Sequence, residues 1–246
     1  MNRLLLEKSE LDADGCVLVA GGRSEHLLEI LRVEVGTEVR CGVLDDSAGT
    51  GTVLEIQPEA VRLQYSASPE ATPARPAIDL LLAMPRPKVM KRLWAQLAAL
   101  GVRRIIVTNA WKVERPYFDS HVLEPSFVRA CLCEGLSQAG DVHLPDVSIH
   151  RRFKVLIEDD LDDLSVAGCR LMLDPSGDES LIGVALSSAP GGILAAIGPE
   201  AGWTPYELDL LGSRGFRPVR LGGRTLRSDT ACIAALSILA CRNVEC

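Results

Sequence analysis

The chain has 246 residues, of which 47% are hydrophobic and 24% charged, a composition typical of a globular protein with one large or two smaller domains. No apolar stretch approaches the roughly 20 residues of a membrane-spanning helix, and the early charges of residues 1–10 do not fit a signal peptide. We therefore expect no membrane segment and a cytoplasmic location, while the net charge of −7 argues weakly against a nucleic-acid partner.

The charge is distributed unevenly along the chain. Residues 1–77 contain 7 Lys or Arg and 13 Asp or Glu, a net charge of −6, which leaves 19 and 20, a net charge of −1, for residues 78–246. A nearly neutral part with segregated charge can still bind phosphate. Five arginines follow one another there without an intervening acid: Arg214, Arg217, Arg220, Arg224 and Arg227.

The eight cysteines form no C-x-x-C pair. Cys131-x-Cys133 is too short for a zinc hairpin and lies far in sequence from the four histidines, so we expect no metal site. Cys232 and Cys241 lie in an apolar segment and are predicted to be small core residues. Reduced thiols are the expected state in the cytoplasm.

Residues 1–66 are predicted to form a small β-barrel, because short apolar runs alternate there with Gly and Asp. Ser24 is predicted to cap a short helix. Residues 67–77 contain three prolines and little hydrophobicity, and are predicted to be a linker. The expected strands are 16–20, 38–43, 51–56 and 61–65, and the expected buried face of the helix is Leu27, Leu28, Ile30 and Leu31.

Residues 78–246 are predicted to form an α/β domain with a mostly parallel sheet. The apolar runs 78–84, 103–108 and 169–173 show no alternation, which is typical of strands covered on both faces. The segment 109–120 is predicted to be a loop and 127–136 a helix.

A helix is predicted from Pro87 to Leu100, with two different faces. The apolar face contains Met90, Leu93, Trp94 and Leu97. The opposite face contains Lys88, Lys91 and Arg92, which form either an ordinary solvated surface or a platform for RNA phosphates.

The carboxyl-terminal part repeats one unit twice. The strands 193–197 and 218–221 are each followed by a glycine loop and a helix start. In the first unit, Thr204, Pro205 and Glu207 form the pattern of an N-cap, first helical position and capping box. In open α/β sheets ligands bind outside the carboxyl ends of strands, so the two loops together can form one pocket. The alternative is two ordinary βα turns.

The last helix, from about Asp229 to Arg242, is apolar almost all round. Such a helix is either buried in its own domain or covered by another chain. For a domain of this size, we expect a subunit interface.

Two motifs are specific enough to indicate a family. GPEAGW at 198–203 and LGGRTLRSDTA at 221–231 resemble the RsmE family of small-subunit rRNA uracil-N3 methyltransferases, members of the SPOUT class, and 26–32 followed by Val35-Gly36 resembles that family's barrel segment. The resemblance implies an N-terminal PUA-like β-barrel that contacts RNA. It also implies a C-terminal SPOUT domain with a trefoil knot, a homodimer formed through that domain, and a role in ribosome biogenesis with rRNA or the small ribosomal subunit as partner.

The resemblance further implies that S-adenosylmethionine binds in the knot. Backbone groups of such loops can bind an adenine edge, and apolar side chains can cover its ring. The positions assigned to donor binding are Leu173, Ile197, Gly198, Pro199, Gly202, Leu221, Gly222, Leu226, Thr230 and Ala231.

Methylation of uracil N3 requires removal of the imide proton and stabilisation of the negative charge on the oxygens. Arg227, which is permanently cationic and makes forked hydrogen bonds, suits the second task. Asp229 or Glu200 can orient that arginine or accept the proton. The alternative for Arg227 and Asp229 is a helix start at which the acid complements the helix dipole. RNA contacts are predicted for Lys88, Lys91, Arg92 and Arg224.

Several positions depart from the family pattern. Asp229 stands where the family usually has Glu, and Trp203 where it has Phe or Leu. Gln96 and Ala99 replace a Lys and a Glu, and 138–141 lacks a common Arg. Two other functions therefore stay open: a SPOUT methyltransferase acting on a different RNA or on a ribose 2′-hydroxyl, and a non-catalytic RNA-binding or assembly protein.

Overall fold

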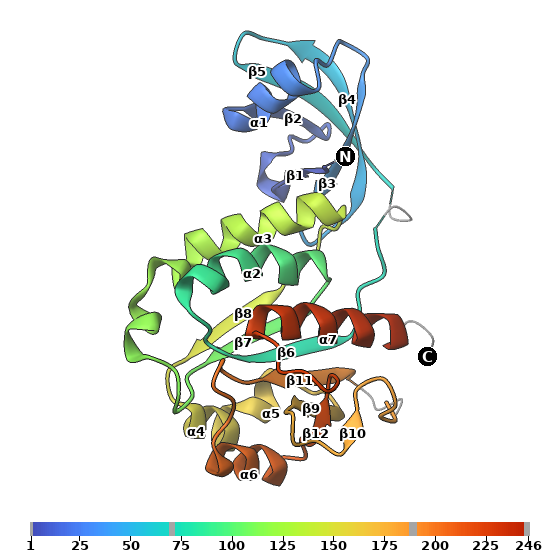
Figure 1. Cartoon of the computed structure of the whole chain (residues 1–246). Coiled ribbons are helices and arrows are strands. Elements are labelled where there is room, and N and C mark those ends of the chain that lie inside the picture. Colours follow the sequence, from blue (N-terminus) through green and yellow to red (C-terminus); the bar gives the residue numbers. More distant parts are fainter. Residues whose placement is uncertain (1, 69–71, 187–190, 244–246) are drawn as a thin grey trace. The chain divides into compact units, whose positions relative to one another are not determined.

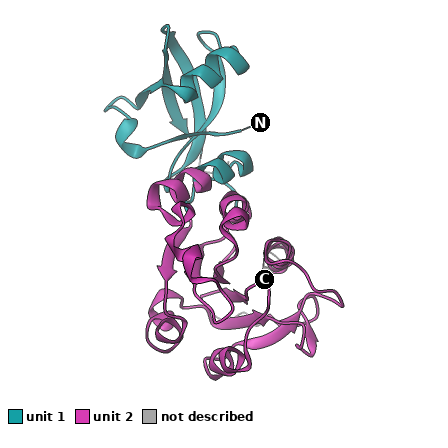
Figure 2. Cartoon of the chain, turned by 60° about the vertical axis from the view of Figure 1, so that its left-hand side comes forward, with its two compact units in different colours: residues 1–74, 133–144 teal, residues 75–132, 145–246 magenta. Residues whose placement is uncertain are grey.

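The computed structural model describes residues 2–68, 72–186 and 191–243, which belong to two compact units. The first contains residues 1–74 and 133–144, and the second contains 75–132 and 145–246 (Figure 2). The sequence did not indicate that 133–144 belongs with the first unit, because this grouping depends on long-range contacts such as Arg3 N–H donating to the Ser137 carbonyl at 2.9 Å. Residues 69–71 of the predicted linker 67–77 lie outside the described residues.

The first unit is built on a curled five-stranded sheet with the order β1-β3-β4-β5-β2 (Figure 1). β1 is parallel to β3, and the other strand pairs are antiparallel. Alternate residues such as Val17, Val19 and Leu63 are buried in one apolar core, as expected for strands with one covered face. The strands are β1 Leu4–Leu6, β2 Cys16–Ala20, β3 Glu38–Val43, β4 Ala48–Ile56 and β5 Ala60–Ala67.

The helix predicted after residue 20 differs from the expectation. Helix α1, Gly22–Glu25, continues into a π-helical segment, His26–Ile30. Ser24 is not its cap, because its hydroxyl lies within α1 and donates to the Gly21 and Glu59 carbonyls at 2.8 and 2.7 Å. Leu27 is buried as predicted, but Ile30 is 68% and Leu31 38% exposed. The wider π turn changes the angular spacing on which a prediction based on 3.6 residues per turn depends.

The second unit is built on a seven-stranded sheet with the order β10-β12-β9-β11-β6-β7-β8 (Figure 1). All of its strand pairs are parallel, which confirms the predicted parallel sheet. β6 and β11 are buried along their whole length, since helices lie on both faces of the sheet. The strands are β6 Ile78–Ala83, β7 Arg104–Thr108, β8 Asp146–His150, β9 Cys169–Leu173, β10 Glu179–Ser180, β11 Ile193–Ile197 and β12 Arg217–Arg220.

Helices α2 and α7 lie together on one face of this sheet, and α4, α5 and α6 lie on the other (Figure 1). The predicted apolar face of α2 is confirmed, since Met90, Leu93, Trp94 and Leu97 are fully buried. Among the described residues, no helix is both long and apolar enough to cross a membrane. The helices are α2 Pro87–Ala99, α3 Pro125–Ala139, α4 Phe153–Val155, α5 Leu161–Leu164, α6 Pro205–Ser213 and α7 Ser228–Asn243.

The chain crosses the carboxyl edge of the sheet after β12. It then enters α7, which packs against β6, β11 and α2 (Figure 1). On α7, Cys232, Leu236 and Leu239 are buried, while Ile233 and Ile238 are only half-buried. The all-round apolar pattern of this helix is therefore only partly covered within one chain. The segment 221–227, which precedes the helix, contributes to the site described next.

Candidate active site

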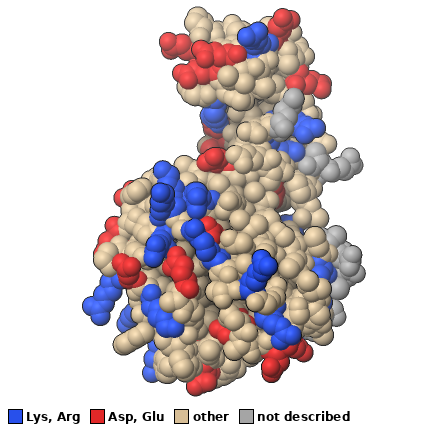
Figure 3. Space-filling view, viewed as in Figure 1, with Lys and Arg blue, Asp and Glu red and all other residues tan. Residues whose placement is uncertain are grey.

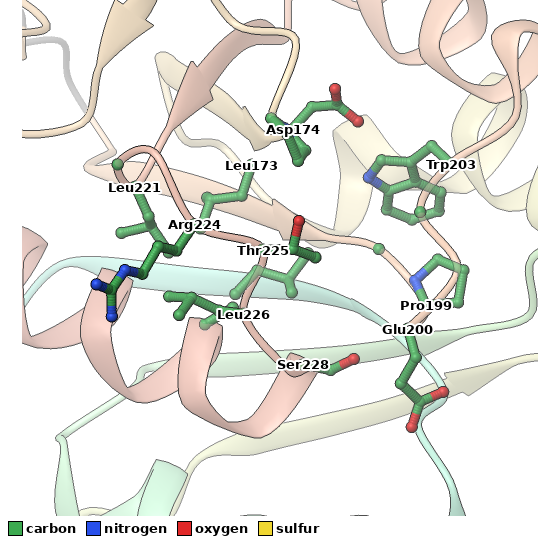
Figure 4. A pocket seen from close by; sticks show the side chains of 16 residues that line it. Leu173, Asp174, Pro199, Glu200, Trp203, Leu221, Arg224, Thr225, Leu226 and Ser228 are labelled. Atoms are coloured by element: carbon green, nitrogen blue, oxygen red, sulfur yellow. The ribbon is translucent and has the colours of Figure 1, made fainter.

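A pocket lies at the carboxyl ends of β9, β11 and β12 (Figure 4). Leu173 pairs in register with Ile197 on one side and Val219 on the other, so the three strands end at nearly the same level. The segment that follows each strand forms one part of the wall. The lining residues are Leu173, Asp174, Pro175, Ile197, Gly198, Pro199, Glu200, Gly202, Trp203, Leu221, Gly222, Arg224, Thr225, Leu226, Ser228 and Ala231.

The loop after β11 is held by the start of α6. Gly202 has a φ of 72°, a left-handed conformation that favours glycine. The predicted capping box is confirmed: the Thr204 hydroxyl accepts from Glu207 N–H at 3.3 Å, and the Glu207 carboxylate accepts from Thr204 N–H at 2.7 Å. Glu207 is 3% exposed, so this carboxylate is both buried and hydrogen-bonded.

The loop after β12 leads the chain into α7. Gly222 has a φ of 147°, which side chains rarely tolerate, and the following residues Arg224, Thr225 and Leu226 are exposed at the pocket. The Arg227 carbonyl accepts from Ala231 N–H at 2.8 Å, the first turn of the helix. A tight glycine turn followed by a helix start is the arrangement that the sequence predicted here.

Two buried polar groups in the pocket wall have no hydrogen-bond partner within the described ranges: the indole nitrogen of Trp203 and the hydroxyl of Ser228. The Trp203 nitrogen faces the pocket interior (Figure 4). A Cβ at Gly198 would lie only 3.0 Å from this nitrogen, so glycine lets the indole ring lie against the loop. Apolar walls with a few convergent polar groups are typical of small-molecule sites, and buried polar groups are normally hydrogen-bonded.

The structure brings nine of the ten predicted donor-binding positions together in this wall. The tenth, Thr230, is exposed on α7 outside the lining. Sequence reasoning placed Leu173, at the carboxyl end of β9, among the donor-binding positions but assigned no binding role to Asp174, Pro175, Thr225 or Ser228. It treated Trp203 only as a departure from the family, although its place directly after the glycine loop was a usable signal.

The three predicted catalytic residues occupy different places. Glu200 lines the pocket, and its Oε1 accepts from Arg86 N–H at 3.5 Å. Arg227 and Asp229 lie outside the lining, and the Arg227 side chain is 69% exposed. Asp229 lies between two guanidiniums, with 3.6 Å to Arg227 Nε and 3.4 Å to Arg92 Nη2. Their catalytic roles stay predictions.

The predicted RNA contacts form a basic helix face and one separate arginine. Lys88, Lys91 and Arg92 are exposed on α2, and Figure 3 shows Lys and Arg side chains gathered over this helix. Gln96, one of the departures, is exposed on the same helix. Arg224 lines the pocket, but its guanidinium points away from the interior (Figure 4).

The fold and the site together define an α/β protein with a small-ligand pocket across the carboxyl ends of a parallel sheet. Residues 72–240 match the RNA methyltransferase domain, and the chain belongs to this RNA methyltransferase family. Over 97% of its length it is 28% identical to "Ribosomal RNA small subunit methyltransferase E" of Treponema pallidum, of which it covers 90%. The family membership predicted from the two motifs is thus confirmed.

Two solved structures share the fold over nearly the whole chain. A putative methyltransferase from Legionella pneumophila, in complex with the bound cofactor SAM, is 20% identical with a TM-score of 0.78, and the match covers 98% of each chain. A ribosomal RNA small subunit methyltransferase E from Neisseria gonorrhoeae, bound to S-adenosyl methionine, is 20% identical with a TM-score of 0.74, covering 96% of this chain and 95% of that one.

Proposed function

We propose that this RNA methyltransferase transfers a methyl group from S-adenosylmethionine to N3 of a uracil base in 16S rRNA, during ribosome biogenesis. The observation that carries the proposal is the convergence of two loops, 198–202 and 222–226, on one pocket at the carboxyl edge of the sheet. Relatives named for small-subunit rRNA methylation, which match nearly the whole chain, support the choice of substrate.

The residues of the pocket suit the methyl donor. Leu173, Ile197 and Leu226 provide apolar surface for an adenine ring, while the Trp203 indole nitrogen and the Ser228 hydroxyl are available for polar contacts. When bound, S-adenosylmethionine supplies an activated methyl group on a sulfonium. Placing the acceptor in line with that group contributes a large share of the acceleration, of order 7–11 kcal/mol at best.

Arg227 is proposed to stabilise the negative charge that develops on the uracil oxygens. Its guanidinium is exposed next to the pocket, and Asp229 is close enough to orient it. Glu200 is the better-placed acceptor for the imide proton, because it lines the pocket and makes one long contact, whereas Asp229 is already engaged by two arginines. Asp229 is therefore a positioning residue in this proposal.

Finer features belong to the same proposal. The curled sheet of the first unit supports a PUA-like barrel that contacts RNA, and the return of the chain from β12 to α7 supports a trefoil knot of the SPOUT class. The half-buried apolar residues of α7 support a homodimer formed through the second unit. Lys88, Lys91, Arg92 and Arg224 are proposed to contact RNA phosphates. A cytoplasmic location follows from the proposed ribosomal substrate.

The proposal is tested with purified protein, labelled donor and small ribosomal subunits that lack this methyl group. Mass mapping of the rRNA is expected to find one new methyl group on a uridine base. A methyl group on a ribose 2′-hydroxyl, or on a different RNA, would keep the enzyme and change its substrate. Absence of donor binding in calorimetry would instead favour a non-catalytic assembly protein.

A further inference from the structure

A second cleft opens along the same edge of the sheet, outside the carboxyl ends of β7 and β8. Thr108 and His150, the last residues of these strands, are partners in the sheet register. The cleft has a volume of about 860 Å³. Its walls come from three segments that are distant in sequence: the loop after β7, the start of α4 and the start of α6. No described residue lines both this cleft and the proposed methyl-donor pocket.

The walls of the cleft are strongly cationic. Arg115, Arg151, Arg152 and Lys154 line it, and the only carboxylate among the lining residues is the buried Glu207. Arg151 and Lys154 have acidic neighbours at 2.9 and 3.8 Å. In contrast, Arg115 and Arg152 form no ion pair with any residue that the structure describes. Concentrated positive charge in a concave surface attracts phosphate groups.

An exposed tryptophan stands among these cations. Trp111 is 85% exposed, whereas Trp94 is fully buried and Trp203 is 5% exposed. Tyr206, which also lines the cleft, is 57% exposed. Large aromatic rings are normally buried for most of their surface. Exposed rings interleaved with cations are the arrangement on which single-stranded nucleic acids stack their bases.

The tryptophan loop is attached to the donor pocket. Trp111 N–H donates to Glu207 Oε1 at 2.7 Å, and the other oxygen of this carboxylate accepts from Thr204 at the start of α6. Lys112 Nζ donates to the Ala201 carbonyl in the glycine loop at 2.8 Å. The two sites are also in contact with each other. The ring of Phe153, which lines the cleft, lies 5.4 Å from the ring of Trp203, which lines the pocket. A ligand in the cleft therefore lies directly beside the pocket.

We propose that this cleft binds unpaired nucleotides next to the target uridine, with a base stacked on Trp111 and phosphates held by Arg115 and Arg152. This inference rests on the proposed function. The N3–H group of uracil makes a hydrogen bond of the Watson–Crick pair, so a uracil must be unpaired when it is methylated at N3. In a single-stranded loop the neighbouring bases are unpaired as well and are available for stacking. The buried Asn109 Oδ1, which has no partner within the described residues, provides an acceptor in the same wall.

The first test uses a uridine oligonucleotide of about eight residues, within the range that single-strand sites cover. Stacking of a base on Trp111 is expected to quench the tryptophan fluorescence of the wild-type protein. The change reports on Trp111, because the other two tryptophans, Trp94 and Trp203, are buried. Affinity is measured separately by anisotropy of the labelled RNA. Trp111→Ala is expected to weaken binding about fivefold or more, and Trp111→Phe, which keeps a stacking ring, to restore most of it.

The second test measures the salt dependence of the same affinity. Arg152→Gln is expected to reduce the slope of log affinity against log salt by about 0.7, the value for one lost phosphate contact on a single strand. Arg104→Gln is the matched control, because Arg104 lies at the amino end of β7, at the opposite edge of the sheet, and pairs with Asp146. This control is expected to leave the slope unchanged.

The outcomes separate the two proposals. Unchanged RNA affinity in Trp111→Ala, no quenching in the wild type, or equal binding of the same RNA as a duplex would overturn the cleft proposal. Calorimetry with the donor alone is expected to give the same affinity for Trp111→Ala and wild type. If RNA binds through Trp111 but no donor binds to the wild type, the cleft proposal stands and the proposed function fails.

Discussion

The proposed donor pocket and the cationic cleft lie along one edge of one sheet, yet they are built in different ways. The pocket consists mainly of apolar side chains and glycine loops at 197–203 and 221–231. The cleft contains four cations and two exposed aromatic rings, taken from segments that begin at Asn109, Arg151 and Thr204. A small ligand is recognised by shape, which short loops provide, whereas an extended polyanion is recognised by charge collected from several elements.

The largest expected effect concerns Arg227, and it tests whether methyl transfer depends on a residue beside the proposed donor pocket. Arg227→Ala is expected to lower the methyl-transfer rate about a hundredfold or more, since one lost charge-stabilising donor has an effect of that size. Because the side chain is 69% exposed and outside the lining, donor affinity and stability are expected to stay unchanged. Single-turnover kinetics measure the methyl-transfer rate, calorimetry measures the donor affinity, and urea unfolding measures the stability. Arg227→Lys, which keeps the charge without the fork, is expected to be intermediate, and wild-type turnover in Arg227→Ala would exclude this residue from the mechanism.

A second prediction concerns the carboxylate that joins the two regions. Glu207→Gln removes one of the acceptors that hold Trp111 N–H and Thr204 N–H, and it is expected to lower the free energy of unfolding by about 1–3 kcal/mol. Urea unfolding measures this. Asp209→Asn, an exposed change on the same helix, is the control and is expected to have little effect.

The same Glu207→Gln variant tests the coupling between the regions. Donor affinity and RNA affinity are expected to fall together, because the glycine loop and the tryptophan loop are anchored to the same side chain. If only one of the two affinities changes, the pocket and the cleft are independent sites that happen to be neighbours.

A smaller effect is expected from a change restricted to the pocket. In Gly198→Ala the new Cβ lies 3.0–3.2 Å from three atoms of the Trp203 ring, so the ring must shift. Overpacking of this kind is expected to weaken donor binding about tenfold. Calorimetry measures the loss against Gly212→Ala, where a Cβ meets no atom within 4 Å. Undiminished donor affinity would show that the indole ring does not contribute to the site.

The smallest prediction concerns His150, at the end of β8 below the cleft. Burial lowers the pKa of His150, against the opposing effect of Asp160. The folded state therefore favours the neutral ring, and the resulting stability is present above about pH 6.5 and lost as the pH falls below it. His150→Gln is expected to flatten this part of the stability profile. Urea unfolding at several pH values measures it.

Much of the local structure was predictable because its causes are local. The strands Cys16–Ala20, Cys169–Leu173 and Ile193–Ile197 have the predicted bounds, since continuous or alternating apolar runs depend only on which faces become covered. The capping box from Thr204 to Glu207 was predictable for the same reason, because its partners lie within one turn.

Other features were not predictable from any local pattern. β8, Asp146–His150, was missed because most of its residues are only partly buried, so its sequence lacks a continuous apolar run. The exposed Ile30 was predicted to be buried, because a π-helical turn follows a different angular spacing. Trp111 was assigned to a plain loop, although its backbone is tied to Glu207, 96 positions away in sequence.

The sequence by itself determined the class of the second unit and most of the residues that line the proposed donor pocket. Glycine turns, helix caps and uninterrupted apolar strands act over a few residues, and the motifs at 198–203 and 221–231 are contiguous. The tertiary structure alone decided which strand ends lie side by side, and therefore that Trp111 and Arg152 share one cleft. Such a surface depends on strand order and register, which no periodicity within a single segment contains.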